Sequence, residues 1–307
     1  MEVLDEIRLN FNQESLLLMN ICMGLVMFGV ALELSLHDFR NMLRQPRSFI
    51  AGLSAQLILL PVLTYLLVIL IQPSAGVALG MILLACCAGG TISNMLTVMA
   101  GGNAALSVSL TASATLLASV ATPANFAFWG NLYLQNSHKL PLISISFTDM
   151  LETVLLVVGI PLLLGMLFNH YFTKISIRLR KPFRIIAVVI FGVFIAAAFA
   201  ANFRIFLDYI HYVALIVLLH NALAYGSGYA LGQVFGLGLP EKKTIAIETG
   251  IQNGGMALIL IFNFFDGLGS MAMIAGWWGI WDIFSGLALA WGLSKIRTKK
   301  TSEIRSA

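Results

Sequence analysis

Long apolar runs separated by short polar stretches make up most of this 307-residue chain. Each run is close to the ~20 residues that a helix needs to cross a bilayer. The runs are too long for the strands of a membrane barrel, which alternate in segments of about ten residues. The pattern therefore predicts an all-α polytopic membrane protein with nine transmembrane helices. We expect these spans at about 15–36, 48–71, 76–100, 104–130, 147–169, 184–202, 209–235, 243–265 and 268–294.

The composition supports a membrane protein. Hydrophobic residues make up 59% of the chain and charged residues 10%, whereas a soluble domain carries about 25% charged residues. The lipid bilayer is therefore the expected partner. The net charge of +4 does not predict nucleic-acid binding, because the basic residues flank the apolar runs. Cys22, Cys86 and Cys87 all lie in apolar stretches, so we expect buried thiols without disulfides; a metal site at the adjacent pair is the alternative.

The basic residues predict the orientation of the helices. With nine spans, only Arg8, Lys139 and Arg204 fall on one side of the membrane. The other fifteen fall on the opposite side: Arg40, Arg44, Arg47, Lys174, Arg178, Arg180, Lys181, Arg184, Lys242, Lys243, Lys295, Arg297, Lys299, Lys300 and Arg305. Cytoplasmic loops carry the excess of Lys and Arg. We therefore expect a cell inner (plasma) membrane protein with its N-terminus outside and its C-terminus in the cytoplasm.

The same count divides the chain into three parts. An acidic extracytoplasmic segment at 1–14 precedes the nine-helix domain at 15–294, and a basic cytoplasmic tail follows at 295–307. The start of the chain is acidic and the first apolar run is long enough to span, so we expect no cleavable signal peptide. The first residues are expected to form either a short interfacial helix or a disordered segment.

Two of the predicted spans are interrupted near their middle by glycines and polar residues. The third contains Gly89-Gly90-Thr91-Ile92-Ser93-Asn94, and the eighth contains Glu248-Thr249-Gly250-Ile251-Gln252-Asn253. They lie five spans apart, so they belong to units of opposite orientation. Paired interruptions of this kind are typical of inverted-repeat transporters with a site near the membrane midplane. The plainer alternative is that the small residues only allow close helix packing.

Glu248 is the residue of the eighth span that most needs an explanation. A charged side chain at the centre of a membrane helix costs roughly 2.5–3.5 kcal/mol on insertion scales. The nearest basic residues, Lys242 and Lys243, lie at the edge of this span and not near its middle. A bound cation is therefore the candidate partner of this carboxylate.

Several ordered motifs resemble the bile acid:sodium symporter family. They are Cys87-Ala88-Gly89-Gly90-Thr91-Ile92-Ser93-Asn94, Gly102-Asn103-Ala104-Ala105-Leu106-Ser107-Val108-Ser109-Leu110-Thr111, Thr122-Pro123 and Glu248-Thr249-Gly250-Ile251-Gln252-Asn253-Gly254. The resemblance implies inverted repeats with two crossing broken helices. It also implies a panel domain, at about 15–36 and 147–202, and a core domain, at about 48–130 and 209–294.

The resemblance further implies two bound Na⁺ ions. One would be held by a first set of residues: Ser93, Asn94, Ser107, Thr111 and Glu248. The other would be held by a second set: Gln56, Glu248, Thr249, Ile251 and Gln252, with Thr249 and Ile251 contributing backbone oxygens. Each position carries an oxygen donor suited to a hard cation. One carboxylate shared by two ions would leave a net positive charge nearby, which favours an anionic substrate.

For the substrate, we expect contacts from Thr91, Asn253 and Asp282. Several relatives carry Trp-His-Asn in the ninth span, where this chain has Trp281-Asp282-Ile283. Asp282 therefore either meets an amino group on the substrate or changes protonation during transport, or it is a neutral acid bonded to a neighbour or facing water. His220 and Asn221 lie inside the seventh span, where polar residues often bond neighbouring helices together.

The function predicted from these features is Na⁺-coupled symport of a small organic anion by alternating access: a bile-acid-like, pantoate-like or keto-acid-like molecule. The protein is expected to work as a monomer. Proton-coupled or arsenite-type efflux is the second transporter hypothesis, and a membrane-embedded sensor or channel is the alternative of another class. We do not expect an enzyme, because no nucleophile–base pair or metal-ligand cluster is visible in the sequence.

Overall fold

A computed structural model describes residues 3–6, 13–34, 45–137, 145–201 and 203–296 of the protein, and these residues are mainly helical. By length and composition, five helices can cross a membrane: Pro46–Ile71, Ala104–Asn136, Phe147–Tyr171, Leu207–Val234 and Gly269–Ser294. Three shorter apolar helices accompany them: Leu16–Ala31, Ala75–Cys86 and Gly254–Phe264. The all-α membrane fold predicted from the sequence is confirmed at this level, and the count of nine spans stays a prediction.

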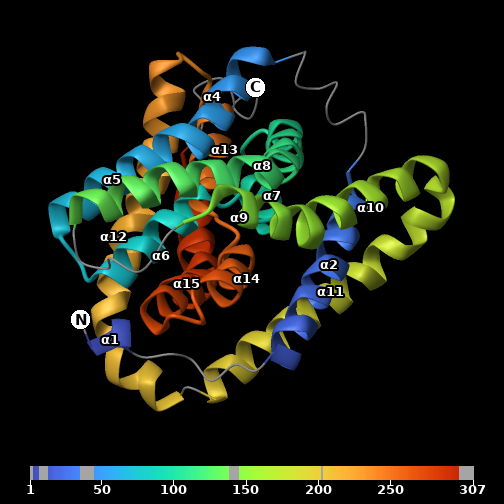
Figure 1. The fold of residues 1–307 in the computed structure, drawn as a ribbon. Helices are drawn as coiled ribbons and strands as arrows, with labels where there is room; N and C mark the ends of the chain where they lie inside the picture. Colours follow the sequence, from blue (N-terminus) through green and yellow to red (C-terminus); the bar gives the residue numbers. More distant parts are fainter. Residues whose placement is uncertain (1–2, 7–12, 35–44, 138–144, 202, 297–307) are drawn as a thin grey trace.

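Figure 1 shows the helices coloured along the chain. In order they are α1 Val3–Glu6, α2 Gln13–Ala31, α4 Pro46–Ser54, the π-helical turn η1 Ala55–Leu59, α5 Leu60–Ile71, α6 Ala75–Cys86, α7 Ile92–Met99, α8 Ala104–Ser137, α9 Phe147–Val154, the π-helical turn η2 Leu155–Gly159, α10 Ile160–Tyr171, α11 Thr173–Ala201, α12 Phe203–Val234, α13 Leu239–Gly250, α14 Gly254–Phe264 and α15 Gly269–Ser294.

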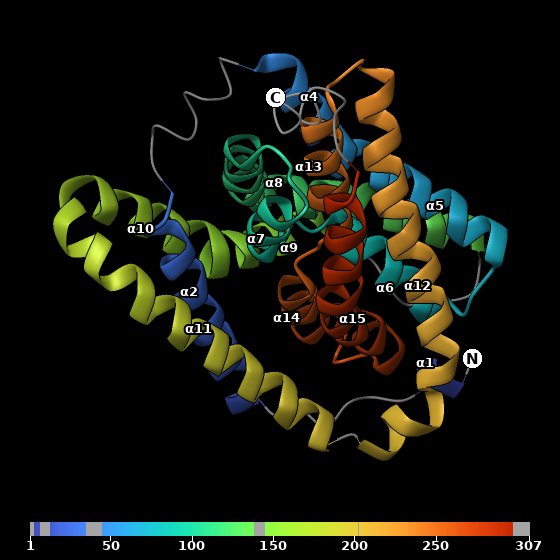
Figure 2. The same ribbon diagram turned by 180° about the vertical axis from the view of Figure 1, so that it is seen from behind.

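The helices form two groups in space. Helices α2, α10 and α11 pack on one another along one side of the molecule, and α12 lies on the far side (Figures 1 and 2). Between them, α6 packs on α8 and α15, and α13 packs on α12. The predicted panel contains α2, α10 and α11, and the predicted core contains α4 to α8 and α12 to α15. The division into two moving domains stays a prediction.

Both interrupted spans are breaks in the structure. Helix α6 ends at Cys86 and α7 begins at Ile92, while α13 ends at Gly250 and α14 begins at Gly254. The two non-helical segments run antiparallel to each other. The N–H of Gly90 donates to the Ile251 carbonyl at 3.2 Å, and the N–H of Asn253 donates to the Ala88 carbonyl at 2.8 Å. Backbone groups that a broken helix frees in the membrane need such partners, and here each break supplies them to the other.

A π-helical turn next to Pro61 adds a third irregularity near the breaks. Pro61 has no N–H to give to the carbonyl of Leu57 four residues earlier. The side-chain amide of Asn125, on α8, donates to that carbonyl at 3.0 Å. The turn η1 includes Gln56, so the widened backbone presents this residue from within a membrane helix.

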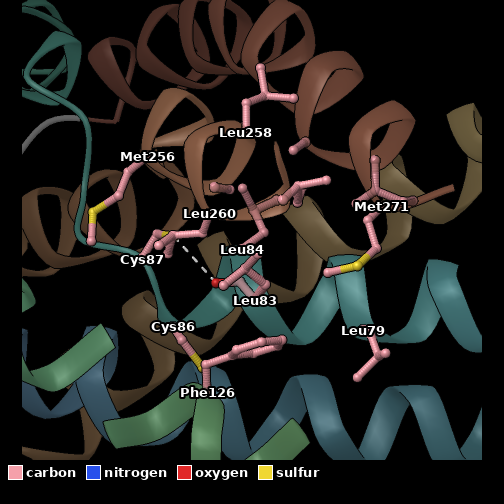
Figure 3. Packing of buried hydrophobic residues seen from close by; sticks show 14 of the residues in the cluster. Leu79, Leu83, Leu84, Cys86, Cys87, Phe126, Met256, Leu258, Leu260 and Met271 are labelled. Atoms are coloured by element: carbon pink, nitrogen blue, oxygen red, sulfur yellow. Dashed lines mark hydrogen bonds between the residues drawn. The ribbon is translucent and has the colours of Figure 1, made fainter. Parts of the chain in front are cut away.

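Helix α6 forms the centre of the hydrophobic core, and all of its residues are buried. Cys86 lies beside Phe126, and Cys87 lies on the side of Leu260 (Figure 3). The Cys87 thiol bonds the Leu83 carbonyl at 3.3 Å. All three cysteines are free thiols, as the sequence predicted.

Part of the N-terminal segment packs on the beginning of α6. The short helix α1 contacts α6 and α15, and Asp5 accepts hydrogen bonds from the Ser74 hydroxyl and the Gly76 N–H, both at 3.1 Å. This favours the helical expectation for residues 3–6 over disorder. Several residues of the charge argument lie outside the described residues: Arg8, Arg40, Arg44, Lys139, Arg297, Lys299, Lys300 and Arg305. Most of the predicted tail and of segment 1–14 also lies outside them.

Candidate functional site

Glu248 lies on the last turns of α13, two residues before that helix ends, and is completely buried. Its carboxylate accepts hydrogen bonds from three hydroxyls. The Ser93 hydroxyl donates at 2.7 Å, the Thr111 hydroxyl reaches the two carboxylate oxygens at 3.2 and 3.0 Å, and the Ser107 hydroxyl also donates to Oε1. These hydroxyls come from α7 and α8. The carboxylate is thus surrounded by neutral donors, with no ion pair among the contacts described for it.

Asn94 completes the first set. Its side-chain oxygen accepts from the Ser107 hydroxyl at 2.8 Å and from the Thr111 hydroxyl at 3.3 Å. The five residues proposed from the sequence as the first set therefore converge, although they are spread over more than 150 positions of the chain. Segments α7, α8 and α13 bring them together.

The second set contains buried polar atoms without hydrogen bonds. Gln56 is fully buried beside the Glu248 carboxylate, but neither its Oε1 nor its Nε2 makes a hydrogen bond of normal geometry. The Oε1 of Gln252 is likewise unbonded, while its Nε2 donates to the Thr249 carbonyl at 2.9 Å. Buried polar atoms in proteins nearly always have a partner. A cation is a partner that would satisfy two such amide oxygens.

Gly89 opens a small space among the oxygens of this second set. A Cβ atom added at Gly89 would lie 3.2 Å from the Glu248 carbonyl oxygen, 3.3 Å from the Ile251 carbonyl oxygen and 3.5 Å from Gln56 Oε1. The position of the missing side chain is therefore close to three oxygens from two segments, the turn η1 and the stretch 248–251. Sequence reasoning missed both Gly89 and the carbonyl of Glu248 here, because neither has side-chain chemistry that suggests a ligand.

Asp282 lies on the other side of the same break. It is buried, with 4% of its surface exposed. Its Oδ2 accepts the N–H of Gln252 at 3.1 Å, and its Oδ1 accepts the side-chain amide of Asn221 at 3.3 Å. The same Asn221 amide also donates to the Gly250 carbonyl, at 2.9 Å. These contacts correspond to the expectation of an acid bonded to a neighbour, and a contact between Asp282 and substrate stays a prediction.

The end of each first half-helix is bonded by a polar side chain. Asn221 binds the last carbonyl of α13, and the hydroxyl of Thr122, on α8, donates to the Cys86 carbonyl of α6 at 2.7 Å. The carbonyls at a helix C-terminus have no partner in the helix itself. As predicted, the polar residues inside the seventh span bond neighbouring helices: His220 contacts the Thr64 hydroxyl on α5 at 2.7 Å.

Thr91 and Asn253 stand at the beginnings of the second half-helices, α7 and α14. The side-chain oxygen of Asn253 accepts the N–H of Met256 at 3.0 Å and so caps α14. Thr91 is exposed and Asn253 is half-buried. Free N–H groups and a positive dipole end occur at such helix starts. The two residues predicted to meet the substrate are therefore the most accessible polar residues of the two breaks.

Comparison with known proteins decides the family. Residues 20–209 match the model of the Sodium Bile acid symporter family. The chain belongs to this family. The matched region contains α6, α7 and α8 and ends before α13, so it does not include Glu248.

Individual relatives extend the match beyond that region. The chain is 32% identical to the uncharacterized sodium-dependent transporter YocS of Bacillus subtilis, over 94% of this chain and 86% of that one. It is 30% identical to the probable sodium/metabolite cotransporter BASS1, chloroplastic, of Arabidopsis thaliana, over 78% of this chain and 58% of that one. It is 27% identical to the ileal sodium/bile acid cotransporter of Cricetulus griseus, over 76% of this chain and 66% of that one. The chain thus spans less than two thirds of the length of the Arabidopsis and Cricetulus relatives. Its family is one of transporters and not of enzymes.

Proposed function

We propose that this protein is a secondary transporter that couples the entry of Na⁺ to the uptake of a small organic anion. The observation that carries the proposal is the junction of the two broken helices. There, the fully buried Glu248 lies beside Gln56, and the buried amide oxygens of Gln56 and Gln252 have no hydrogen bond. The buried carboxylate has no basic partner and the amide oxygens have no hydrogen-bond donor. A bound cation would stabilise both.

The proposed ions are held by the two sets. In the first set, the hydroxyls of Ser93, Ser107 and Thr111 donate to Glu248. A hydroxyl carries two lone pairs as well as one donor, so rotation of these groups would turn their oxygens toward a cation. Asn94 Oδ1 lies against two of them. The change needs only rotation about single bonds.

In the second set, the ion would occupy the space beside Gly89. Gln56 Oε1 and the carbonyl oxygens of Glu248 and Ile251 face this space. Gln252 Oε1 is free to join them, and the Thr249 carbonyl is engaged by the Gln252 amide next to it. Unwound carbonyls and half-helix C-termini are the usual Na⁺ ligands in transporters with broken helices.

An anionic substrate follows from the charge of the loaded site. Two Na⁺ ions around the single Glu248 carboxylate leave one positive charge, and the starts of α7 and α14 add free N–H groups and the positive ends of helix dipoles. Thr91 and Asn253, at these helix starts, are the proposed polar contacts. An organic anion next to this positive charge would be stabilised only when Na⁺ is present, which is the basis of coupling.

The proposed movement is a rocking of panel against core in a nine-span protein of the cell inner (plasma) membrane, with its N-terminus outside. Helices α2, α10 and α11 pack mainly on one another, which supports their moving as one unit. The protein is proposed to act as a monomer, because both sets are complete within one chain. Each net positive charge that moves inward gains about 2.3 kcal/mol per 100 mV of membrane potential.

Thermal unfolding of the purified full-length protein tests the proposal directly. A ligand at about 100 times its Kd stabilises the folded state by about 2.7 kcal/mol, so saturating Na⁺ raises Tm while K⁺ at equal ionic strength does not. Addition of a mixed set of organic anions raises Tm further only in Na⁺. Glu248→Ala abolishes the Na⁺ response. A full Na⁺ response in Glu248→Ala excludes the proposed sites.

The efflux hypothesis is less well supported by the same structure. Cys86 and Cys87 are both buried in the apolar core, and the described residues contain no group of three His, Cys, Asp or Glu side chains placed to hold a metal ion. Uptake in proteoliposomes separates the remaining candidates. A symporter gives saturable uptake that depends on a Na⁺ gradient at constant pH, whereas efflux driven by protons or conduction through a channel does not.

A further inference from the structure

Asp282 binds the backbone of the break rather than open space. Both carboxylate oxygens are engaged, by the N–H of Gln252 and by the side-chain amide of Asn221. With 4% of its surface exposed, it has little room for a third partner. Among the described residues, Glu248 and Asp282 are the two buried carboxylates. Glu248 lies in α13 just before the non-helical segment, and Asp282 bonds the backbone of that segment at Gln252.

The position of Asp282 is unfavourable for a negative charge by itself. Helix α13 ends at Gly250, and the carbonyls at a helix C-terminus carry roughly half a negative charge. Asn221 places its amide between the Gly250 carbonyl and Asp282, but an amide is neutral. A positive charge close to the break would offset the repulsion.

Gln252 connects Asp282 to such a position. Its N–H is bonded to Asp282, while its side-chain Oε1 is one of the unpaired oxygens of the second set. The preceding carbonyl, of Ile251, faces the space at Gly89. One hydrogen bond to the backbone of Gln252 therefore fixes the segment that supplies two of the oxygens.

We propose that Asp282 is a positioning residue for the second Na⁺ ion. By accepting the hydrogen bond of the Gln252 N–H, it directs Gln252 Oε1 and the Ile251 carbonyl toward the space beside Gly89. It also places a second negative charge behind the ion. This inference rests on the proposed function. It assigns Asp282 to the coupling ion and not to the substrate. Substitution of Asp282 therefore changes the affinity and cooperativity of Na⁺ before it changes the choice of anion.

The first test is a Na⁺ titration of the full-length protein without substrate, followed by thermal unfolding or tryptophan fluorescence. Asp282→Asn weakens the apparent Na⁺ affinity by about tenfold, which corresponds to about 1.4 kcal/mol, and brings the Hill coefficient from above 1 toward 1. The matched control is Ser285→Ala on the same helix, whose hydroxyl contacts Tyr225 at 3.2 Å; this variant keeps the wild-type titration. Wild-type Na⁺ affinity and cooperativity in Asp282→Asn, with loss of the response to anions, overturn the inference in favour of a substrate contact.

A double-mutant cycle distinguishes positioning from a general loss of stability. If Asp282 acts in part through Gln252, the variant Asp282→Asn/Gln252→Ala loses less Na⁺ affinity than the sum of the losses in the two single variants. Residues that act independently give additive effects, and additivity here overturns the inference. If Asp282→Asn does not give folded protein, Asp282→Glu, which shifts the carboxylate by one methylene, takes its place in the cycle with the same expectation.

Different results contradict the proposed function and the role of Asp282. Absence of any Na⁺ response in the wild-type protein contradicts the proposed function itself. A normal wild-type response that is unchanged by Asp282→Asn contradicts only the role of Asp282.

Discussion

Asn20 on α2 and Asn263 on α14 exchange two side-chain hydrogen bonds, at 3.2 and 3.0 Å. The pair joins the predicted panel to the predicted core, across a separation of 243 positions in the sequence. In the predicted orientation, both residues lie toward the outer side, because Asn20 follows the extracytoplasmic N-terminus and Asn263 lies near the end of the eighth span. In alternating access by rocking of panel against core, this contact has to break when the outer side opens.

Removal of the pair is therefore expected to favour the outward-open state. Interhelical hydrogen bonds in membrane proteins contribute on average about 0.6 kcal/mol each, so loss of both shifts the equilibrium by roughly eightfold. We expect Asn20→Ala and Asn263→Ala each to increase the apparent affinity for Na⁺ supplied from outside and to slow turnover. Uptake by proteoliposomes of defined orientation measures both. Asn136→Ala, which removes a contact with Tyr65, is the control; an equal effect there argues against a gate.

A methyl group at Gly89 is expected to remove the second ion. The added Cβ of Gly89→Ala lies between Gln56 Oε1 and the carbonyls of Glu248 and Ile251, at 3.2 to 3.5 Å from each. The Hill coefficient for Na⁺ then falls toward 1, while binding to the first set continues. A Na⁺ titration followed by thermal unfolding measures this. Gly226→Ala adds the same methyl where no atom lies within 4 Å and leaves the titration unchanged; two-ion binding in Gly89→Ala contradicts the second site.

The hydroxyls around Glu248 provide a test of the first ion. Ser107→Ala removes an oxygen that contacts both Glu248 and Asn94. A hydrogen bond to a charged group contributes about 1.5 kcal/mol. We therefore expect Ser107→Ala to weaken Na⁺ binding by roughly tenfold. Thr115→Ala on the same helix is the matched control, because its hydroxyl bonds only the Thr111 carbonyl among the contacts described for it. Equal effects of the two substitutions would mean that helix α8 as a whole, and not the Ser107 oxygen, is responsible.

Thr122 is expected to matter for stability more than for ion binding. Thr122→Val removes the donor to the Cys86 carbonyl at the end of α6 and keeps the shape of the side chain. An unsatisfied buried acceptor costs about 1–3 kcal/mol, which lowers Tm. Thr122→Ser retains the hydroxyl and most of the stability. A large loss of Na⁺ affinity in Thr122→Val at a temperature where it is folded would instead connect this residue to the ions.

Much of the site was predictable because the cost of polar groups in a membrane is local. Glu248, the glycines before Thr91 and the amides after Gly250 interrupt apolar stretches, and the bilayer penalises each of them wherever they occur along the helix. The sequence therefore identified both breaks and the oxygen-bearing residues around them. It also identified the family, because the motifs lie in order on the chain, and the family match confirms the family.

Other features follow only from how distant segments cross. The sequence shows that Gln56, Gln252 and Asp282 are polar, but not which of their atoms are left without a partner. That depends on the antiparallel pairing of the two breaks and on the packing of α12 and α15 behind α13. Gly89 belongs to the site through the side chain that it lacks, and Asn20 is bonded to Asn263 because two helices far apart in the chain meet. The sequence by itself determined which residues could not remain unpaired in a membrane, because burial in the bilayer is a property of each segment. The tertiary structure decided which partners these residues have, because hydrogen bonds depend on the distances between segments.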